Sequence, residues 1–162
     1  MLRRMDLAIT RELPVTLAQC ELTHLSREPI DFPRAVAQHQ SYCAALAALG
    51  LTVLRLPADP GYPDCCFVED TAVVLDEVAV IASPGVASRR GETALIASTL
   101  AGYRPLVHLE LPATLEGGDV LQVGRRLFVG RTTRTSDAGI AALAAAVAPW
   151  GYQVVPVAVS GC

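Results

Sequence analysis

Apolar and polar positions along the chain form blocks that predict an α/β fold. A short apolar strand is expected at Leu7–Thr10, and a helix over Arg34–Leu49 leads to a second strand at Thr52–Leu56. Residues 11–31, between the first strand and the helix, follow no period. Connections of this length are uncommon in compact domains and often form lids or binding loops.

The ends of the first helix follow cap chemistry. Asp31 precedes the helix, Pro33 lies in its first turn, and Gly50 comes directly after it. The apolar face that we expect to be buried consists of four residues, Val36, Cys43, Leu46 and Leu49.

The rest of the chain carries one pattern of elements twice. Each copy starts with an apolar hairpin and continues into a helix and a strand. The first copy is expected to contain the hairpin Thr71–Ala82 with its turn at Asp76–Glu77, the helix Thr93–Leu100 and the strand Leu106–Leu109. The second copy is expected to contain the hairpin Val120–Gly130 with its turn at Gly124–Arg126, the helix Asp137–Val147 and the strand Gln153–Val157. The second of these helices is almost entirely apolar at its centre, so we expect protein to cover more than one of its sides.

A charge pattern repeats together with these elements. Asp70 precedes the first hairpin as Asp119, 49 residues later, precedes the second, and Arg89 and Arg134 follow the respective hairpins. A supersecondary unit that repeats at about 50 residues is typical of radial or stacked architectures. Acids before one buried strand and arginines after its partner would face one small space. Such a space suits a ligand that is cationic at one end and anionic at the other.

Composition narrows the class of protein. The chain has 162 residues, of which 52% are hydrophobic and 18% charged, and this describes one globular domain with a core. A net charge of −3 offers no basic field for nucleic acid or an anionic membrane, and no apolar run reaches the ~18 residues of a membrane span. Without a signal peptide or a CxxC pair, we expect reduced thiols, no zinc site and a cytoplasmic protein. The five cysteines are Cys20, Cys43, Cys65, Cys66 and Cys162.

The acids near the hairpins are compatible with two kinds of ligand. Their oxygens would suit Mg²⁺ or Ca²⁺, but an arginine beside a metal ion is unfavourable unless an anion binds as well. Carboxylates also bind a guanidinium group through paired hydrogen bonds, which fits this mixture of charges better. The acids in question are Asp64, Glu69, Asp70, Glu116 and Asp119. We expect ordinary ion pairs or caps at Arg90, Arg125 and Arg126, and no catalytic role for His39 and His108.

Four segments carry a more specific pattern. They are Asp64-Cys-Cys-Phe-Val-Glu-Asp70, Pro84-Gly-Val-Ala-Ser-Arg89-Arg-Gly-Glu92, Leu115-Glu-Gly-Gly-Asp-Val120 and Val129-Gly-Arg-Thr-Thr-Arg134-Thr135. Together they resemble the dimethylarginine dimethylaminohydrolase family of the guanidine-modifying (pentein) superfamily, and the match runs in order from Leu7 to the end of the chain. The resemblance implies a five-fold pseudosymmetric β/α propeller of ββαβ modules. Residues 1–162 would then be a single incomplete domain with about three of five modules, the first ones over 5–111 and a further, truncated one over 112–162.

The resemblance also implies a reaction. In that family a cysteine thiolate attacks the guanidinium carbon of a methylated arginine, and the products are citrulline and methylamine or dimethylamine. The chain would belong to a cytoplasmic hydrolase of arginine metabolism, with a small-molecule substrate and without a metal or another cofactor.

Residue roles follow from the same resemblance. Carried over by position, the substrate-binding residues would be Leu22, Asp64, Glu69, Asp70, Arg89 and Arg134. Leu22 would close over the ligand, and Asp64 and Glu69 would contact it. Asp70 would bind the guanidinium group, and the two arginines would hold the α-carboxylate end. Glu116 would be an acid of the active site that orients the catalytic histidine or the guanidinium group.

Two parts of the family pattern are missing. The family's histidine lies in a His-Leu-Lys segment just beyond the strand that ends here near Val159, and its nucleophilic cysteine comes near the end of a longer chain. We therefore expect this chain to hold the substrate-recognition half, to be inactive by itself and to form a homo-oligomer through uncovered module faces. Two alternatives stay open. One is a non-catalytic binding protein for arginine derivatives, and the other is a different guanidine-modifying enzyme such as an arginine deiminase.

Overall fold

A computed structural model describes residues 7–22 and 26–159. The chain divides into two compact units, Met1–Val68 and Glu69–Cys162. Both units contain helices and strands, so the predicted α/β class is confirmed, and each strand and helix expected from the sequence pattern is present close to its predicted bounds. Among the described residues, none of the helices has the length and apolar character that crossing a bilayer requires.

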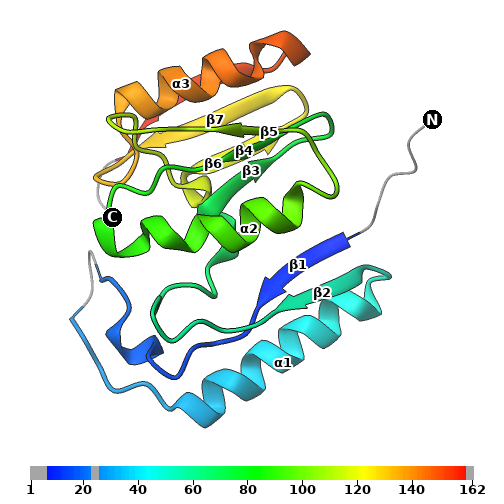
Figure 1. Cartoon of the computed structure of the whole chain (residues 1–162), viewed down its shortest axis with the longest axis vertical. Coiled ribbons are helices and arrows are strands. Elements are labelled where there is room, and N and C mark those ends of the chain that lie inside the picture. The colour runs from blue at the N-terminus through cyan, green and yellow to red at the C-terminus, as the bar shows by residue number, and fades with distance from the viewer. Residues whose placement is uncertain (1–6, 23–25, 160–162) are drawn as a thin grey trace. The chain divides into compact units, whose positions relative to one another are not determined.

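The first unit contains two parallel strands connected through a helix (Figure 1). Strand β1 (Leu7–Arg11) pairs with β2 (Thr52–Leu56), with Leu7 opposite Thr52. Helix α1 (Phe32–Ala48) comes between them in the chain and lies against β2. A crossover through a helix is the usual way to join parallel strands.

The caps of α1 are those that the sequence predicts, but of the four residues predicted to be buried only Cys43 is fully buried; Val36 and Leu46 are partly buried and Leu49 is exposed. The Asp31 carboxylate accepts a hydrogen bond of 3.0 Å from the backbone N–H of Arg34, and Gly50 supplies a left-handed φ of 88° after the helix. Cys43 is buried, as expected. Leu49 is 79% exposed, because it is the C-cap residue and lies beyond the last helical turn.

The second unit contains the repeat as two three-stranded sheets of the same topology. The first sheet consists of β3 (Ala72–Val74), β4 (Ala79–Ile81) and β5 (Leu106–His108), and the second of β6 (Val120–Val123), β7 (Arg126–Arg131) and β8 (Gln153–Ala158). In each sheet the first two strands are antiparallel and the third pairs in parallel with the central one. Helices α2 (Thr93–Leu100) and α3 (Asp137–Val147) connect the central strand to the third (Figure 1). The repeated order of elements is therefore confirmed.

One apolar core joins both sheets of this unit. Its residues with no exposed surface include Val78, Val80, Leu115, Leu127, Val129, Leu143 and Val147. Helix α3 buries one face, while Ala141 and Ala145 on the other side are exposed. The expectation that protein covers more than one side of α3 is therefore wrong. Alanine is the best helix former and adds little apolar area, so it is accepted at exposed helical positions.

The hairpin turns of the two sheets are joined by a charged contact. Arg125 Nη2 donates a hydrogen bond of 2.6 Å to Glu77 Oε1, and the Tyr152 hydroxyl donates one of 3.0 Å to Glu77 Oε2. The Arg125 guanidinium group lies 4.6 Å from the centre of the Tyr152 ring. This is the surface ion pair expected for Arg125, and it connects the turn ends of the two hairpins.

Candidate functional site

In the second unit, the predicted acids and arginines lie at the open ends of the two hairpins, opposite the hairpin turns that Arg125 and Glu77 connect. The acids lie on or beside two 3₁₀ turns, Val68–Thr71 before β3 and Gly117–Asp119 before β6. Arg89 lies on the 3₁₀ helix Ala87–Glu92 after β4, and Arg134 lies in the loop after β7. In a hairpin, the first strand begins at the same end of the sheet at which the second strand finishes. The acids before the first strand and the arginine after the second therefore lie close together in each copy.

Arg89 is the centre of an ion-pair cluster. Its side chain is 5% exposed, and its guanidinium group contacts three carboxylates. Nη1 donates a hydrogen bond of 2.8 Å to Asp70 Oδ2 and lies 3.6 Å from Glu116 Oε2. Nε and Nη2 donate hydrogen bonds of 3.1 and 2.9 Å to Glu92 Oε2. Burial alone lowers the pKa of Arg89, but the hydrogen bonds to Glu92 and Asp70 outweigh it, so the pKa is raised and Arg89 stays positively charged.

Glu116 connects the arginines of the two copies. Its Oε2 is the atom near Arg89, and its Oε1 accepts a hydrogen bond of 3.3 Å from Nη1 of Arg134. The Glu116 side chain is 9% exposed and that of Arg134 is 18% exposed. Four of the predicted site residues, Asp70, Arg89, Glu116 and Arg134, are thus brought together in one cluster.

Asp119 occupies the position of Asp70 but has different partners. Its Oδ2 accepts hydrogen bonds from the hydroxyl groups of Thr132, at 2.8 Å, and Thr135, at 2.5 Å. The Thr135 hydroxyl oxygen also accepts a bond of 3.1 Å from the backbone N–H of Glu116, and the Thr132 oxygen accepts one of 3.0 Å from that of Arg134. Asp119 therefore fixes the backbone on which Glu116 and Arg134 are mounted.

The two glycines between Glu116 and Asp119 allow the acidic turns of the two copies to approach each other. A methyl group on Gly117 would overlap the backbone oxygen of Glu69 and lie 2.8 Å from that of Ala72. One on Gly118 would overlap the carboxylate of Asp70. The Glu-Gly-Gly-Asp segment thus has a packing reason, since at Gly117 only glycine leaves room for the backbone of the first copy, and at Gly118 a methyl group would displace the Asp70 carboxylate.

Burial changes the titration of the acids in this cluster. It raises the pKa of Glu116, while the charges of Arg89 and Arg134 act in the opposite direction. Burial also raises the pKa of Glu69, and the neighbouring Asp70 charge adds to this effect, against a backbone hydrogen bond and Arg89 that lower it. Both groups therefore hold their protons to a higher pH than an exposed glutamate does.

This titration predicts how stability depends on pH. Above 4.5, the ordinary value for glutamate, the folded protein binds more protons than the unfolded chain at Glu69 and Glu116. The free energy of unfolding is therefore expected to fall as the pH rises from there through the two raised pKa values. Urea unfolding at a series of pH values measures this slope. It should be smaller in Glu116→Gln, and equal slopes in the two proteins would contradict the assignment to Glu116.

The two remaining predicted residues, Leu22 and Asp64, belong to the first unit. Asp64 is 5% exposed, and both of its carboxylate oxygens accept from the backbone N–H of Glu21, at 3.2 and 3.1 Å. Leu22, the next residue, is 40% exposed. Asp64 thereby holds the segment that presents Leu22. Their predicted contacts with a ligand stay predictions.

Sequence reasoning gave no role to Glu92, Thr132 and Thr135, although all three hold predicted site residues. A signal for Glu92 was its position three residues after Arg89, a spacing at which side chains on one helical turn meet. For Thr132 and Thr135 the signal was their position next to Arg134, in a loop that the repeat places near Asp119. Within the described part of the chain, no group of three or more His, Cys, Asp or Glu side chains is arranged to hold a metal ion.

No family model matches the chain, but comparison with known proteins identifies proteins that are similar to it in sequence and in structure. A dimethylarginine dimethylaminohydrolase of Streptomyces coelicolor is 42% identical over 154 residues, which are 94% of this chain and 60% of the relative. The protein of that name from Pseudomonas aeruginosa is 36% identical over 119 residues, 72% of this chain and 46% of the relative. A solved structure of the Pseudomonas aeruginosa protein, a cysteine-to-serine variant complexed with citrulline, matches with a TM-score of 0.93 at 31% identity, over 98% of this chain and 62% of that one.

These similarities confirm the family that the four sequence segments indicated. This chain spans between 46% and 62% of the length of the proteins in the three matches described above. The named relatives are enzymes, hydrolases of dimethylarginine by their names. By sequence and by fold, the chain is a homologue of proteins named dimethylarginine dimethylaminohydrolase, of which it covers 60–62%.

Proposed function

We propose that the charged cluster of the second unit binds a methylated arginine. The chain would be the substrate-recognition half of an enzyme that hydrolyses this compound, through a cysteine thiol, to citrulline and methylamine or dimethylamine. The observation that supports this best is Glu116, whose two oxygens lie beside the arginines of the two copies while Asp70 lies beside Arg89. The names of the relatives, and the citrulline in one related structure, support the same substrate class.

The charges of the cluster favour a cationic group. The carboxylates of Glu69, Asp70, Glu92 and Glu116 lie with the guanidinium groups of Arg89 and Arg134, which leaves an excess of two negative charges when all are ionised. Asp70 and Glu116 would bind the substrate guanidinium, since paired carboxylate oxygens match its N–H groups. Glu69 would contact the substrate from the same turn.

The arginines would bind the other end of the substrate. Arg134 is the more exposed of the two, at 18% against 5% for Arg89, so we assign it the larger direct contact with the α-carboxylate.

A second candidate is a non-catalytic binding protein for arginine derivatives. This candidate uses the same cluster and the same ligand, and it is distinguished by the absence of turnover in every longer form of the protein. An arginine deiminase would instead prefer arginine without methyl groups.

Ligand preference tests the assignment of Arg134. Arg134→Ala is expected to weaken binding of methylarginine to the 162-residue chain about ten- to a hundredfold, because a charged hydrogen bond contributes roughly 1.5–3 kcal/mol. Binding of the decarboxylated analogue should change little, since it lacks the group that Arg134 would hold. Isothermal titration calorimetry measures both affinities.

A matched control is available on the neighbouring strand. Arg131 is 51% exposed and pairs with Asp137, outside the cluster. Arg131→Ala should leave both affinities unchanged. Equal losses for the two ligands in Arg134→Ala would remove Arg134 from the carboxylate role.

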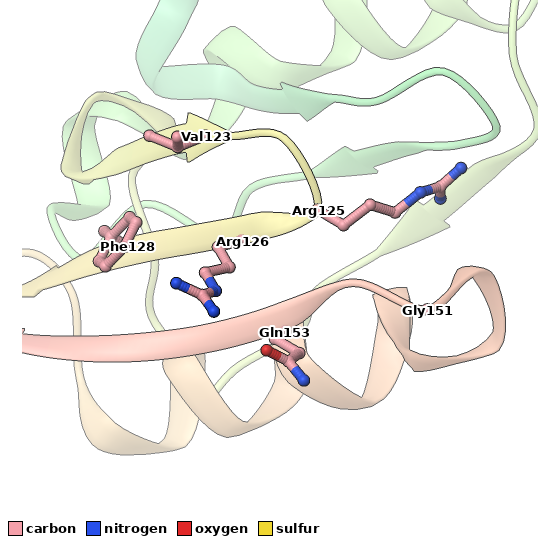
Figure 2. A pocket seen from close by; sticks show the side chains of 6 residues that line it. All are labelled: Val123, Arg125, Arg126, Phe128, Gly151 and Gln153. Atoms are coloured by element: carbon pink, nitrogen blue, oxygen red, sulfur yellow. The ribbon is translucent and has the colours of Figure 1, made fainter.

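We also propose that the two ββαβ units are modules of a propeller and that the second sheet forms an interface with a second copy of the chain. In the first sheet, all of β4 is buried, from Ala79 to Ile81. In the second sheet, Leu127 and Val129 are buried, but the other face exposes Leu121 by 63% and Val123 by 57%. The same face carries a groove of about 430 Å³. Figure 2 shows side chains that line it, among them Val123, Arg126, Phe128 and Gln153. Exposed apolar patches of this kind mark interaction sites.

Self-association of the 162-residue chain is therefore expected. Sedimentation velocity over a range of concentrations should show dimers or larger species, and Leu121→Glu should shift the distribution towards the monomer because it places a charge in the apolar contact. Val74→Glu, at a residue of the first sheet that is 48% exposed, serves as the control. A single monomeric boundary at all concentrations would overturn the proposed interface.

A further inference from the structure

Glu92 is a buried acid of the cluster to which the family resemblance gives no role. Its side chain is 1% exposed. It meets Arg89 through two of the guanidinium nitrogens, with Nε donating to Oε1 and Oε2 at 3.3 and 3.1 Å and Nη2 donating to Oε2 at 2.9 Å. A contact through two nitrogens fixes both the position and the rotation of a planar guanidinium group.

The second copy lacks this contact. The residue three positions after Arg134 is Asp137, as Glu92 is three positions after Arg89. Asp137 is 74% exposed, and its Oδ1 accepts a hydrogen bond of 2.6 Å from Nε of Arg131. The buried contact between an arginine and the acid of the following turn is therefore a property of the first copy and not a general requirement of the ββαβ unit.

The orientation that Glu92 imposes decides which atoms face the remaining acids. With Nε and Nη2 bonded to Glu92, Nη1 is directed to Asp70 at 2.8 Å and to Glu116 at 3.6 Å. The Glu92 carboxylate also offsets the charge of Arg89, which lowers its repulsion of a cationic ligand bound to the neighbouring acids.

We propose that Glu92 is a positioning residue for guanidinium binding: it holds Arg89 so that Nη1 orients Asp70 and Glu116, and it neutralises the Arg89 charge towards the ligand. This inference rests on the proposed function of the cluster. It distinguishes Glu92 from Arg134, because a disturbed pair of guanidinium-binding acids affects every ligand with a guanidinium group, with or without a carboxylate.

The test uses the 162-residue chain with Glu92→Gln, which keeps the size and removes the charge, Glu92→Asp, which keeps the charge, and Asp137→Asn as the matched control. Calorimetric titration with methylarginine and with its decarboxylated analogue is expected to show both affinities lowered about tenfold or more in Glu92→Gln. Glu92→Asp should recover part of the loss, and Asp137→Asn should bind both ligands as the wild type does. Wild-type affinities in a folded Glu92→Gln, or a loss restricted to methylarginine, would overturn the proposal.

A measurement without ligand keeps this test separate from that of the proposed function. In ¹⁵N NMR spectra of the unliganded chain, the Nε–H signal of Arg89, assigned by its absence in Arg89→Lys, should exchange slowly with water because it is buried against Glu92. Arg131, exposed at the surface, provides a rapidly exchanging reference signal. Rapid exchange at Arg89 would overturn the positioning role even where Glu92→Gln does not fold. A slowly exchanging signal in a wild-type chain that binds neither ligand would instead contradict the proposed function alone.

Discussion

The 162-residue chain is expected to release no citrulline from methylarginine above the level of a variant in which Cys65, Cys66 and Cys162 are replaced. Attack on a guanidinium carbon requires a thiolate beside it and a proton donor for the leaving amine. Residues 69–159, which contain the cluster, have no cysteine, and their one histidine is His108, exposed on β5. Binding that is no stronger in the transition state than in the ground state does not accelerate the reaction.

The assay for this prediction is citrulline release by the purified chain, measured beside the cysteine-substituted variant and beside a blank without protein. Calorimetric binding of methylarginine serves as the control that the cluster is intact, so that inactivity is not mistaken for unfolding. Turnover above the substituted variant would contradict the prediction and would place the nucleophile among the three cysteines.

The elements of the fold were predictable because local rules decide them. The caps of α1, Asp31 and Gly50, have the geometry that their residue types predict. The apolar runs around Asp76–Glu77 and Gly124–Arg125 form hairpins in which both turns are placed by polar or glycine residues. The charge pattern placed Asp70 beside Arg89 correctly, since the first strand of a hairpin begins where the second one ends.

Burial and partner choice were less predictable because they depend on contacts distant in the chain. Apolar character predicted a buried Leu49 and a helix α3 covered on several sides, yet Leu49 and Ala141 are exposed. Asp70 and Asp119 occupy matching positions in the repeat, but Asp119 accepts hydrogen bonds from the hydroxyl groups of Thr132 and Thr135. Only the folded chain shows which acid reaches which arginine.

The two copies therefore share a topology and differ in chemistry. In the first copy, the acid on the 3₁₀ turn contacts the arginine directly. In the second, the corresponding acid stabilises the backbone, and Glu116, three residues earlier, contacts arginines of both copies. The two similar units therefore form one cluster, to which the first copy contributes Asp70 and Arg89 and the second contributes Glu116 and Arg134.

Gly117→Ala is expected to disrupt the close contact between the two copies. The added methyl group would overlap the backbone oxygen of Glu69 and lie 2.8 Å from that of Ala72. Backbone atoms cannot rotate away, so the two acidic turns must separate. Overpacking of this kind typically costs about 1–3 kcal/mol, and we expect a loss of unfolding free energy near the upper end together with loss of methylarginine binding. Urea unfolding and calorimetry measure the two effects.

Two further glycines make the prediction specific. Gly118→Ala would overlap only the Asp70 carboxylate, the end of a flexible side chain, so it should weaken methylarginine binding with a smaller loss of stability. Gly102→Ala would place its methyl group 3.6 Å from the backbone oxygen of Thr99, an ordinary contact, and should change neither property by more than about 1 kcal/mol. If Gly117→Ala is as stable as Gly102→Ala and binds methylarginine equally well, the acidic turns do not need their close approach, and the cluster does not depend on the Glu-Gly-Gly-Asp segment.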